Sequence, residues 1–279
     1  MSFAALLETL NSVIWSPALV FLCLAVGVYF TLTTLFLQVR CLPDMMRQIV
    51  SNKKSGSGVS SFESLMISLA GRVGVGNIAG VATAIAFGGP GAVFWMWAVA
   101  LLGSATSFIE CTLAQIYKEK DRDTGEYRGG PAYYIEKAYK HTRAGKFMLV
   151  YAVVFAVAMM LATSYFLPGI QANGVAAAMH NAWGTDVRIS AVVLGILLAV
   201  IIMGGVRRIA NFASLVVPLM AVVYILASIV IMFVNFDRID DVFSLIFRSA
   251  FDQEAMFSGM LGAAIMWGVK RGIYSNEAG

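Results

Sequence analysis

The amino-acid sequence predicts an all-α polytopic membrane protein. Of the 279 residues, 59% are hydrophobic and only 13% are charged, whereas an average soluble domain is about 25% charged. Apolar stretches of the roughly 20 residues that a helix needs to cross a bilayer recur along almost the whole chain. The polar stretches between them are too short for a soluble domain of ordinary size. We therefore expect a single transmembrane domain over residues 1–279.

Seven spans are predicted from the apolar runs and their polar interruptions. We expect the second span to be broken near residues 71–77 and the seventh to be incomplete. The predicted spans cover residues 13–37, 60–87, 90–117, 147–179, 189–206, 211–235 and 255–279. After the third span, Gly129, Gly130 and Pro131 indicate a loop, and the following PAYYIEKAYK is typical of a short interfacial helix.

The distribution of basic residues predicts the orientation. If the N-terminus lies outside, the cytoplasmic connections hold 14 of the 20 Lys and Arg residues and the external connections hold three. Cytoplasmic loops are enriched in Lys and Arg, so we expect a multi-pass protein of the cell inner (plasma) membrane with an external N-terminus. The first apolar stretch lacks a basic segment before it and a small-residue cleavage site, so we expect it to be retained.

Composition argues against several other classes of protein. The net charge of +4 reflects loop orientation in a membrane protein, so we expect no nucleic-acid partner. The three cysteines lack the CxxC spacing of a zinc site or redox motif. The two histidines, His141 and His180, lie in polar connections far apart in the sequence. We therefore expect no resident metal and no cofactor.

Six ionisable residues lie at bilayer depth in the predicted spans. Such groups are costly in lipid and usually face a protein interior or an aqueous cavity. Interhelical ion pairs or side chains that reach the interface would also account for them, most readily for Glu63 and Glu110. The six residues are Glu63, Arg72, Glu110, Lys270, Arg271 and Glu277.

Four glycines within ten residues predict the break in the second span, in the sequence GRVGVGNIAG at 71–80. Each interior glycine weakens a helix by about 1 kcal/mol relative to alanine. Irregular backbone at this depth is tolerated only where it is buried or lines a cavity, so the break is a candidate binding site. Close helix packing through small residues is the alternative. The same stretch fits a dinucleotide-binding pattern, but it lacks the strand and helix of a soluble βαβ unit.

The end of the chain repeats this pattern. KRGIYSNEAG at 270–279 aligns without gaps with GRVGVGNIAG, with four identities at a constant offset of 199 residues. The windows lie in the second and seventh predicted spans, which are an odd number of spans apart, so the interrupted segments cross the membrane in opposite directions. An inverted pair of broken helices is a sequence indicator of a transporter site. Its half-helix N-termini suit a carboxylate and its unwound carbonyls suit a cation.

Three stretches carry a family resemblance: GGPGAVFWMWAVALLG at 88–103, GVGNIAGVATAIAFGGPG at 74–91 and RGIYSNEAG at 271–279. Through them the sequence resembles the sodium:alanine (alanine or glycine:cation) symporter family. This resemblance implies a leucine-transporter-like inverted-repeat fold. The chain would hold one extra helix, the first five-helix repeat and the start of the second, which makes it a truncated first half. Two residues depart from the family pattern: Val75 replaces an expected threonine, which puts the substrate range in question, and Ala98 replaces a bulkier apolar residue.

The resemblance implies a set of site residues. Gln171 also stands out by itself, because an amide after Pro168 and Gly169 in an apolar run can bind a zwitterion or form an interhelical hydrogen bond. The implied sodium ligands are main-chain carbonyls near Ala70 and Val73. The implied substrate-binding residues are Gly74, Val75, Gly76, Asn77, Gln171, Ser275, Asn276, Glu277, Ala278 and Gly279.

The function predicted from these features is sodium-coupled symport of alanine, glycine or similar small amino acids by alternating access. The expected partners are the amino acid, the co-transported sodium ion and the lipid bilayer. An ion channel or another sodium-coupled small-solute transporter is the alternative, because both also use broken helices. An enzyme is not expected, since neither histidine lies in a confident span beside a candidate nucleophile.

Overall fold

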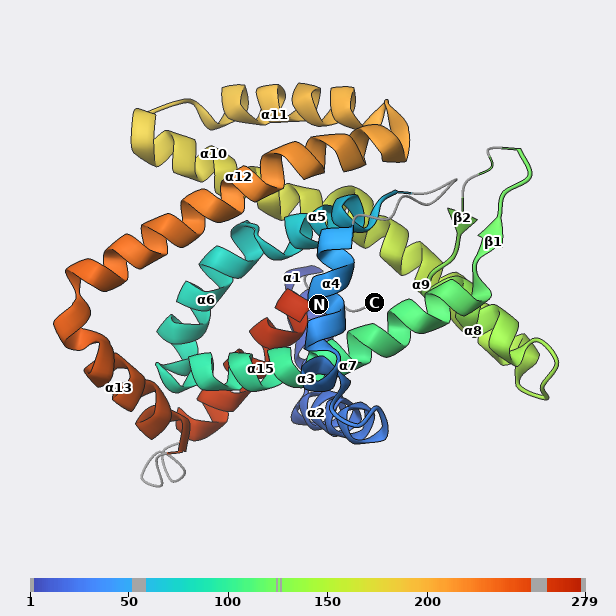
Figure 1. The fold of residues 1–279 in the computed structure, drawn as a ribbon, viewed down its shortest axis with the longest axis horizontal. Helices are drawn as coiled ribbons and strands as arrows, with labels where there is room; N and C mark the ends of the chain where they lie inside the picture. Colours follow the sequence, from blue (N-terminus) through green and yellow to red (C-terminus); the bar gives the residue numbers. More distant parts are fainter. Residues whose placement is uncertain (1–2, 52–58, 124, 126, 252–259, 277–279) are drawn as a thin grey trace. The chain divides into compact units, whose positions relative to one another are not determined.

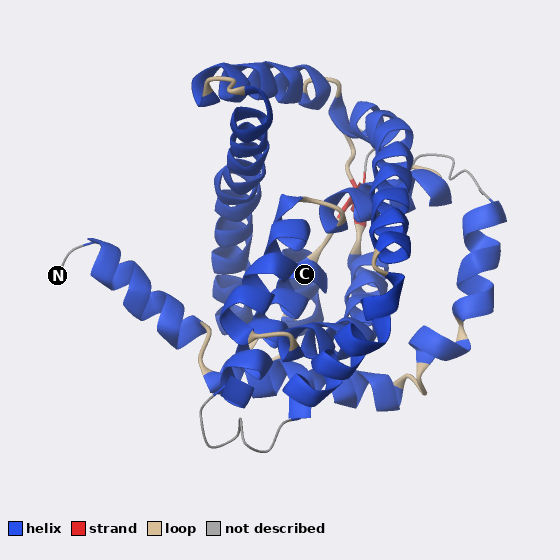
Figure 2. Cartoon of the chain, turned by 90° about the vertical axis from the view of Figure 1, so that its left-hand side faces the viewer, coloured by secondary structure: helices blue, strands red, loops and turns tan. Residues whose placement is uncertain are grey.

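A computed structural model describes residues 3–51, 59–123, 125, 127–251 and 260–276 of the chain. These residues are almost entirely helical, with one short two-stranded hairpin (Figure 2). Figure 1 shows the elements coloured along the chain. The principal helices are α1 Phe3–Ile14, α2 Pro17–Thr33, α3 Leu37–Arg40, α4 Leu42–Ser51, α5 Ser61–Arg72, α6 Val75–Gly88, α7 Gly91–Tyr117, α8 Pro131–Tyr139, α9 Gly145–Leu161, α10 Leu167–Trp183, α11 Val187–Ile202, α12 Gly205–Val234, α13 Ile239–Phe251 and α15 Met260–Asn276.

Five helical segments in the described part of the chain are long and apolar enough to cross a membrane. They are Glu8–Thr33, Ser61–Gly88, Gly91–Tyr117, Gly145–Trp183 and Gly205–Val234, and the shorter α11 is also apolar. This is the architecture of a polytopic membrane protein.

Local sequence signals account for several helix boundaries. Pro17 occupies the first turn of α2, where a missing N–H costs nothing. A capping box starts α5: the Glu63 N–H donates to the Ser60 hydroxyl, and the Ser60 N–H donates to the Glu63 carboxylate. Glu63 therefore has a clear structural task at a helix start. A π-helical turn at Ala162–Phe166 joins α9 to α10 just before Pro168, which is how a proline is accommodated within a long helix.

Two boundaries differ from the sequence expectation. The α11–α12 connection lies at Met203 and Gly204, so the two arginines expected in a loop, Arg207 and Arg208, belong to the first turn of α12. Gly205 has a φ of +72°, a conformation that favours glycine. His180 was expected in a connection but lies in the last turn of α10, which ends at Gly184 in the left-handed conformation. A left-handed glycine, rather than the loss of hydropathy, ends this helix.

The chain forms two compact units. The first comprises Met1–Leu42, Asn77–Phe108 and Ser228–Ala278. Its core joins Val20 of α2, Val99 of α7 and Val269 of α15. Phe94 of the aromatic signature lies edge-on to Phe251 of α13, with ring centroids 4.7 Å apart. The FWMW stretch thus has a packing role.

Glycines let α15 approach α7 closely within this first unit. A Cβ at Gly268 would lie 2.6 Å from the Ala92 carbonyl oxygen and from Trp95 Cβ, and one at Gly272 would lie 2.8 Å from Val99 Cβ. Real Cβ atoms do not come this close to such neighbours. Small residues spaced four apart allow membrane helices to pack with their backbones near each other.

The second unit comprises Pro43–Gly76 and Ile109–Ala227. Its core joins Met66 of α5 to Ala213 and Val217 of α12. Helices α10 and α11 pack against each other in this unit.

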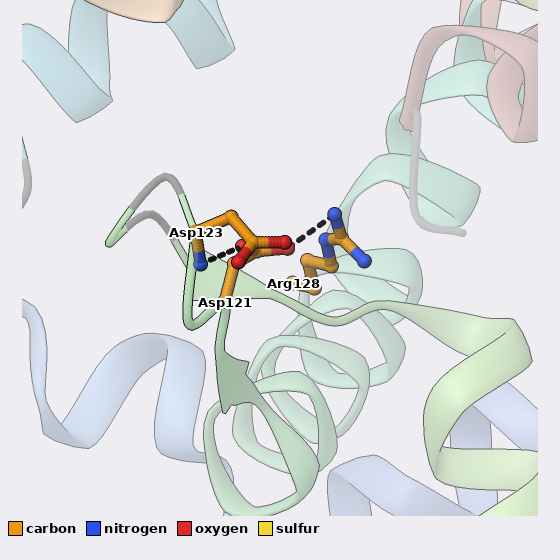
Figure 3. A network of polar contacts seen from close by, with 3 residues as sticks. All are labelled: Asp121, Asp123 and Arg128. Carbon is orange, nitrogen blue, oxygen red and sulfur yellow. Dashed lines mark hydrogen bonds and ion pairs between the residues drawn. The ribbon is translucent and has the colours of Figure 1, made fainter.

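A charged hairpin follows α7 in the second unit. Strands β1, Glu119–Lys120, and β2, Tyr127–Arg128, pair antiparallel, and Arg128 forms an ion pair with Asp121, whose carboxylate also accepts from the Asp123 N–H (Figure 3). Lys137 of α8 donates to the Tyr117 carbonyl at the end of α7 and pairs with Glu119, each at 2.7 Å. The hydrogen bond from Lys137 lowers the pKa of Glu119. The helix expected at PAYYIEKAYK is present as α8.

The second interruption, expected in residues 270–279, does not occur up to Asn276. Helix α15 continues through Lys270, Arg271 and Ser275, and residues 277–279 lie outside the described part of the chain. The window contains one glycine within the helix, Gly272, whereas the first window has four within ten residues. One glycine weakens a helix by only about 1 kcal/mol, which is too little to break it.

The close approach of α15 to α7 predicts the effect of adding a methyl group at Gly268. Gly268→Ala should destabilise the protein by about 1–3 kcal/mol, because overpacking displaces neighbouring backbone. On the same helix, a methyl group at Gly262 would have nothing within 4 Å, so Gly262→Ala should be neutral or stabilising by about 0.4–1 kcal/mol. Unfolding in detergent micelles measures both. Equal effects of the two substitutions would contradict this packing.

Candidate functional site

The interruption between α5 and α6 forms the centre of the candidate site. Helix α5 ends at Arg72, and Val73 has a non-helical backbone with φ −102° and ψ 70°. Its N–H donates the last hydrogen bond of α5, to the Leu69 carbonyl. Helix α6 begins two residues later at Val75. The first N–H groups of a helix have no intrahelical acceptor, so the start of α6 requires partners from elsewhere.

Gln171 of α10 supplies one such partner. The Val75 N–H donates to Gln171 Oε1 at 2.9 Å in a half-buried position. A Cβ at Gly74 would lie 3.2 Å from both Oε1 and Nε2 of Gln171, tighter than most real contacts. The absence of a side chain at Gly74 therefore lets the carboxamide lie against the backbone and cap α6.

Gly174 of α10 contacts the side chain of Val75. A Cβ at Gly174 would overlap both methyl groups of Val75, so the Val75 side chain fills the space that this glycine leaves. Gln171 and Gly174 are three residues apart and so share one face of α10. We call these two contacts to Val75 the α10 clamp. Gly174 was not among the residues predicted from the sequence, although its spacing from Gln171 places it on the same helix face.

A second group of predicted site residues lies in the first unit. Ser275 of α15 donates its hydroxyl to Asn77 Oδ1 of α6 at 2.8 Å. One turn away, the aliphatic part of Arg271 lies beside Gly80, where a Cβ would be 3.6 Å from Arg271 Cδ. Residues 77–80 of the first window and 271–275 of the second therefore lie side by side on α6 and α15.

Aromatic rings accommodate the two cations of α15. Lys270 Nζ lies 5.8 Å and Arg271 Cζ lies 5.9 Å from the centroid of the Trp267 ring. Lys270 Nζ also lies 5.9 Å from the ring of Trp15. Cation–π contacts of this kind are attractive and gain strength where water is excluded. They give these charges a structural role.

The predicted site residues divide between the two units. The second unit contains Gly74, Val75, Gly76 and Gln171, and the first contains Asn77, Ser275 and Asn276. Asn276 is the last residue of α15, and Glu277, Ala278 and Gly279 lie outside the described residues. Ala70 is in the last turn of α5 and Val73 directly follows that helix. Arg72 donates to the Ser68 carbonyl and hydroxyl one turn earlier.

Main-chain carbonyls at the end of α5 are the oxygen acceptors that the break exposes. Among the described residues, no group of three or more His, Cys, Asp or Glu side chains could hold a metal ion. The last carbonyls of a helix, in contrast, lack intrahelical donors. The end of α5, near Ala70 and Val73, has carbonyls of this kind.

Comparison with protein families decides the classification. The family model described as the sodium:alanine symporter family matches residues 1–279. The chain belongs to the sodium:alanine symporter family. This is a family of symporters, which are transport proteins.

Several curated relatives of the family are similar over nearly the whole chain. A Bacillus subtilis protein with the provisional name sodium/proton-dependent alanine carrier protein YrbD is 52% identical over 99% of this chain. The provisional sodium/glutamine symporter GlnT of the same organism is 44% identical over 96%. The sodium/alanine symporter AgcS of Methanococcus maripaludis is 43% identical over 100%. The chain spans 55% of the length of the first two relatives and 61% of the third.

The α10 clamp predicts a compensating pair of substitutions. Gly174→Ala should destabilise the protein by about 1–3 kcal/mol, because the new methyl group collides with Val75. Combining it with Val75→Ala should recover at least half of that loss, since the smaller side chain vacates the space. A double-mutant cycle of unfolding free energies measures the coupling.

Gly169→Ala is the matched control on α10, because a methyl group there would have nothing within 4 Å. It should leave stability within about 1 kcal/mol of the original protein. If Val75→Ala failed to relieve the cost of Gly174→Ala, the packing of Val75 against Gly174 would be wrong.

Proposed function

We propose that the complete gene product carrying this chain is a symporter that couples uptake of alanine, glycine or a similar small amino acid to the entry of sodium by alternating access. The observation that carries the proposal is the interruption at Val73 and Gly74 within an apolar helix of a sodium:alanine symporter family member. A half-helix N-terminus attracts a carboxylate, and the carbonyls at a helix C-terminus attract a cation.

The proposed substrate site uses main-chain and side-chain groups at both sequence windows. It comprises Gly74, Val75, Gly76, Asn77, Gln171, Ser275, Asn276, Glu277, Ala278 and Gly279. The N–H groups at the start of α6 would bind the carboxylate. The proposed sodium ligands are main-chain carbonyls near Ala70 and Val73, which lie at or just beyond the end of α5.

The clamp gives Gln171 a specific role in this proposal. Its Oε1 is engaged by the Val75 N–H, so Nε2 is the part of the carboxamide that can donate to a substrate carboxylate. The hydrogen bond from the Val75 N–H thereby orients the Nε2 donor of Gln171. The Val75 side chain, which replaces the expected threonine, packs against Gly174, so we propose that it affects substrate range through the position of the backbone.

The leucine-transporter-like inverted-repeat fold is part of the proposal. The alignment of GRVGVGNIAG with KRGIYSNEAG supports it, as does the Asn77–Ser275 hydrogen bond between these windows. We further propose that the protein lies in the cell inner membrane with its N-terminus outside, in contact with lipid along its apolar helices. The relatives are named for alanine in two cases and glutamine in one. Competition between alanine and glutamine for uptake measures which amino acid is preferred.

Uptake of labelled alanine tests the function. Cells or liposomes containing the complete gene product should accumulate alanine when a sodium gradient is present, and replacing sodium with choline should abolish accumulation. Accumulation against the alanine gradient requires coupling, which a channel cannot supply. Sodium currents without amino-acid accumulation would instead support the channel alternative.

Asn77→Ala tests the site within the same assay. Removing one partner of a buried polar group costs about 1–3 kcal/mol, so the KM for alanine should rise roughly 5- to 150-fold. Trp97→Phe is the control, because it keeps an aromatic ring near Phe243 and Phe247 and should change packing more than KM. An unchanged KM with reduced thermal stability would make Asn77 a structural residue.

Cysteine labelling tests the orientation. A cysteine at Lys120, in the charged hairpin, should resist an impermeant thiol reagent in intact cells, whereas one at Asp237, in the connection after α12, should react. The original cysteines Cys23, Cys41 and Cys111 would first be replaced by serine. The opposite labelling pattern would reverse the orientation that the distribution of Lys and Arg predicts.

A further inference from the structure

An apolar groove lies along α11 beside the first turns of α12. Its volume is about 610 Å³, and it is lined by Val193, Ile196, Leu197 and Val200 of α11 and by Arg208 and Phe212 of α12. All of these residues belong to the second unit. The groove is distant in sequence from the α10 clamp and is not part of the candidate substrate site.

One face of α11 forms the apolar wall of the groove. Ile201 completes the α11 side of the lining. These five residues follow the spacing that places side chains on a single helix face. They are also accessible: Val193 is 56% exposed and Ile196 is 62% exposed. From Val193 to Val200 the wall extends for about 10 Å along the helix axis. A flexible hydrocarbon chain fits such a surface, because the wall offers apolar contact without hydrogen-bonding groups.

Arg208 lines the groove and lies in the first turn of α12, directly after the α11–α12 connection. Its aliphatic part folds over Gly204, where a Cβ would overlap Arg208 Cδ. Gly204 therefore allows the arginine stem to lie along the connection. The sequence from Met203 to Arg208 contains a second arginine, Arg207, and no acidic residue.

The charge of Arg208 has no carboxylate partner within the described part of the chain. The ion pairs found there involve other residues. An arginine at the edge of a membrane protein is costly to leave without an anion if it approaches the lipid. Its guanidinium can form two parallel hydrogen bonds to a phosphate.

We propose that this groove binds an anionic phospholipid of the surrounding bilayer, with one acyl chain along α11 and the phosphate on Arg208. The order of charged and apolar residues along the groove matches the order of phosphate and acyl chain in such a lipid. Arg208 lies beside an interhelical connection, and the apolar wall extends away from it. A soluble anion would leave the apolar wall unused. A peptide would bring main-chain polar groups that the wall cannot satisfy.

Native mass spectrometry of the purified complete gene product tests the site. The probes are phosphatidylglycerol and phosphatidylcholine with identical acyl chains. The original protein should retain phosphatidylglycerol about tenfold more strongly than phosphatidylcholine, the preference expected from one charge-assisted contact. Arg208→Gln should remove this preference, and Arg208→Lys should keep part of it. Leu197→Trp should reduce retention of both lipids by filling the groove.

Arg188→Gln is the matched control, because Arg188 lies in the first turn of α11, away from the groove lining. It should leave the lipid preference unchanged. Each variant is first checked for a single folded species by thermal unfolding, and Arg208→Lys supplies a folded comparison if Arg208→Gln unfolds. A preference that persists in Arg208→Gln would overturn the proposal.

A photoreactive residue at Val193 separates lipid from protein as the occupant. In native membranes it should crosslink to phospholipid. Crosslinking to another segment of the protein would overturn the proposal. Because the lipid assay does not require transport, failure of alanine uptake would leave its outcome unaffected.

Discussion

A helix interrupted inside an apolar segment must find partners for the main-chain groups that the interruption exposes. At the start of α6 one of these groups is satisfied by the hydrogen bond from the Val75 N–H to Gln171 Oε1 at 2.9 Å. Without it, a donor would be left unsatisfied where water is scarce, at a cost of several kcal/mol in hydrocarbon. The same bond leaves the Gln171 amide hydrogens available. Gln171 therefore contributes both to the stability of the break and to the proposed ligand recognition.

Glycine serves two different purposes in this protein. Gly74 admits the Gln171 carboxamide and Gly174 admits the Val75 side chain, so both act at the interruption. Gly268 and Gly272 instead let α15 lie against α7 within a continuous helix. Small residues allow close contact between helices that gain no hydrophobic driving force from lipid. A glycine in a membrane helix thus indicates close approach more reliably than it indicates a break.

Several elements could not be predicted from hydropathy. Helix α13 has acidic residues in its first turn and Arg248 in its last turn, which complement the helix dipole but lower its apolar character. Hydropathy therefore indicates a connection there, although Phe247 and Phe251 pack around Phe94. The hairpin after α7 depends on ion pairs such as that between Arg128 and Asp121 (Figure 3). A single sequence does not show which acidic residue pairs with which basic residue, so this hairpin could not be predicted.

The sequence by itself determined that this is a helical membrane protein, that it carries a symporter-family signature, and that a glycine cluster marks residues 71–80, because hydropathy and glycine spacing are local properties. Only the tertiary structure decided that Gln171 caps Val75, that Gly174 receives its side chain, and that Ser275 donates to Asn77. The two hydrogen bonds join residues 96 and 198 positions apart. Their geometry depends on how helices pack, since a side chain's partner is set by the helix face opposite it.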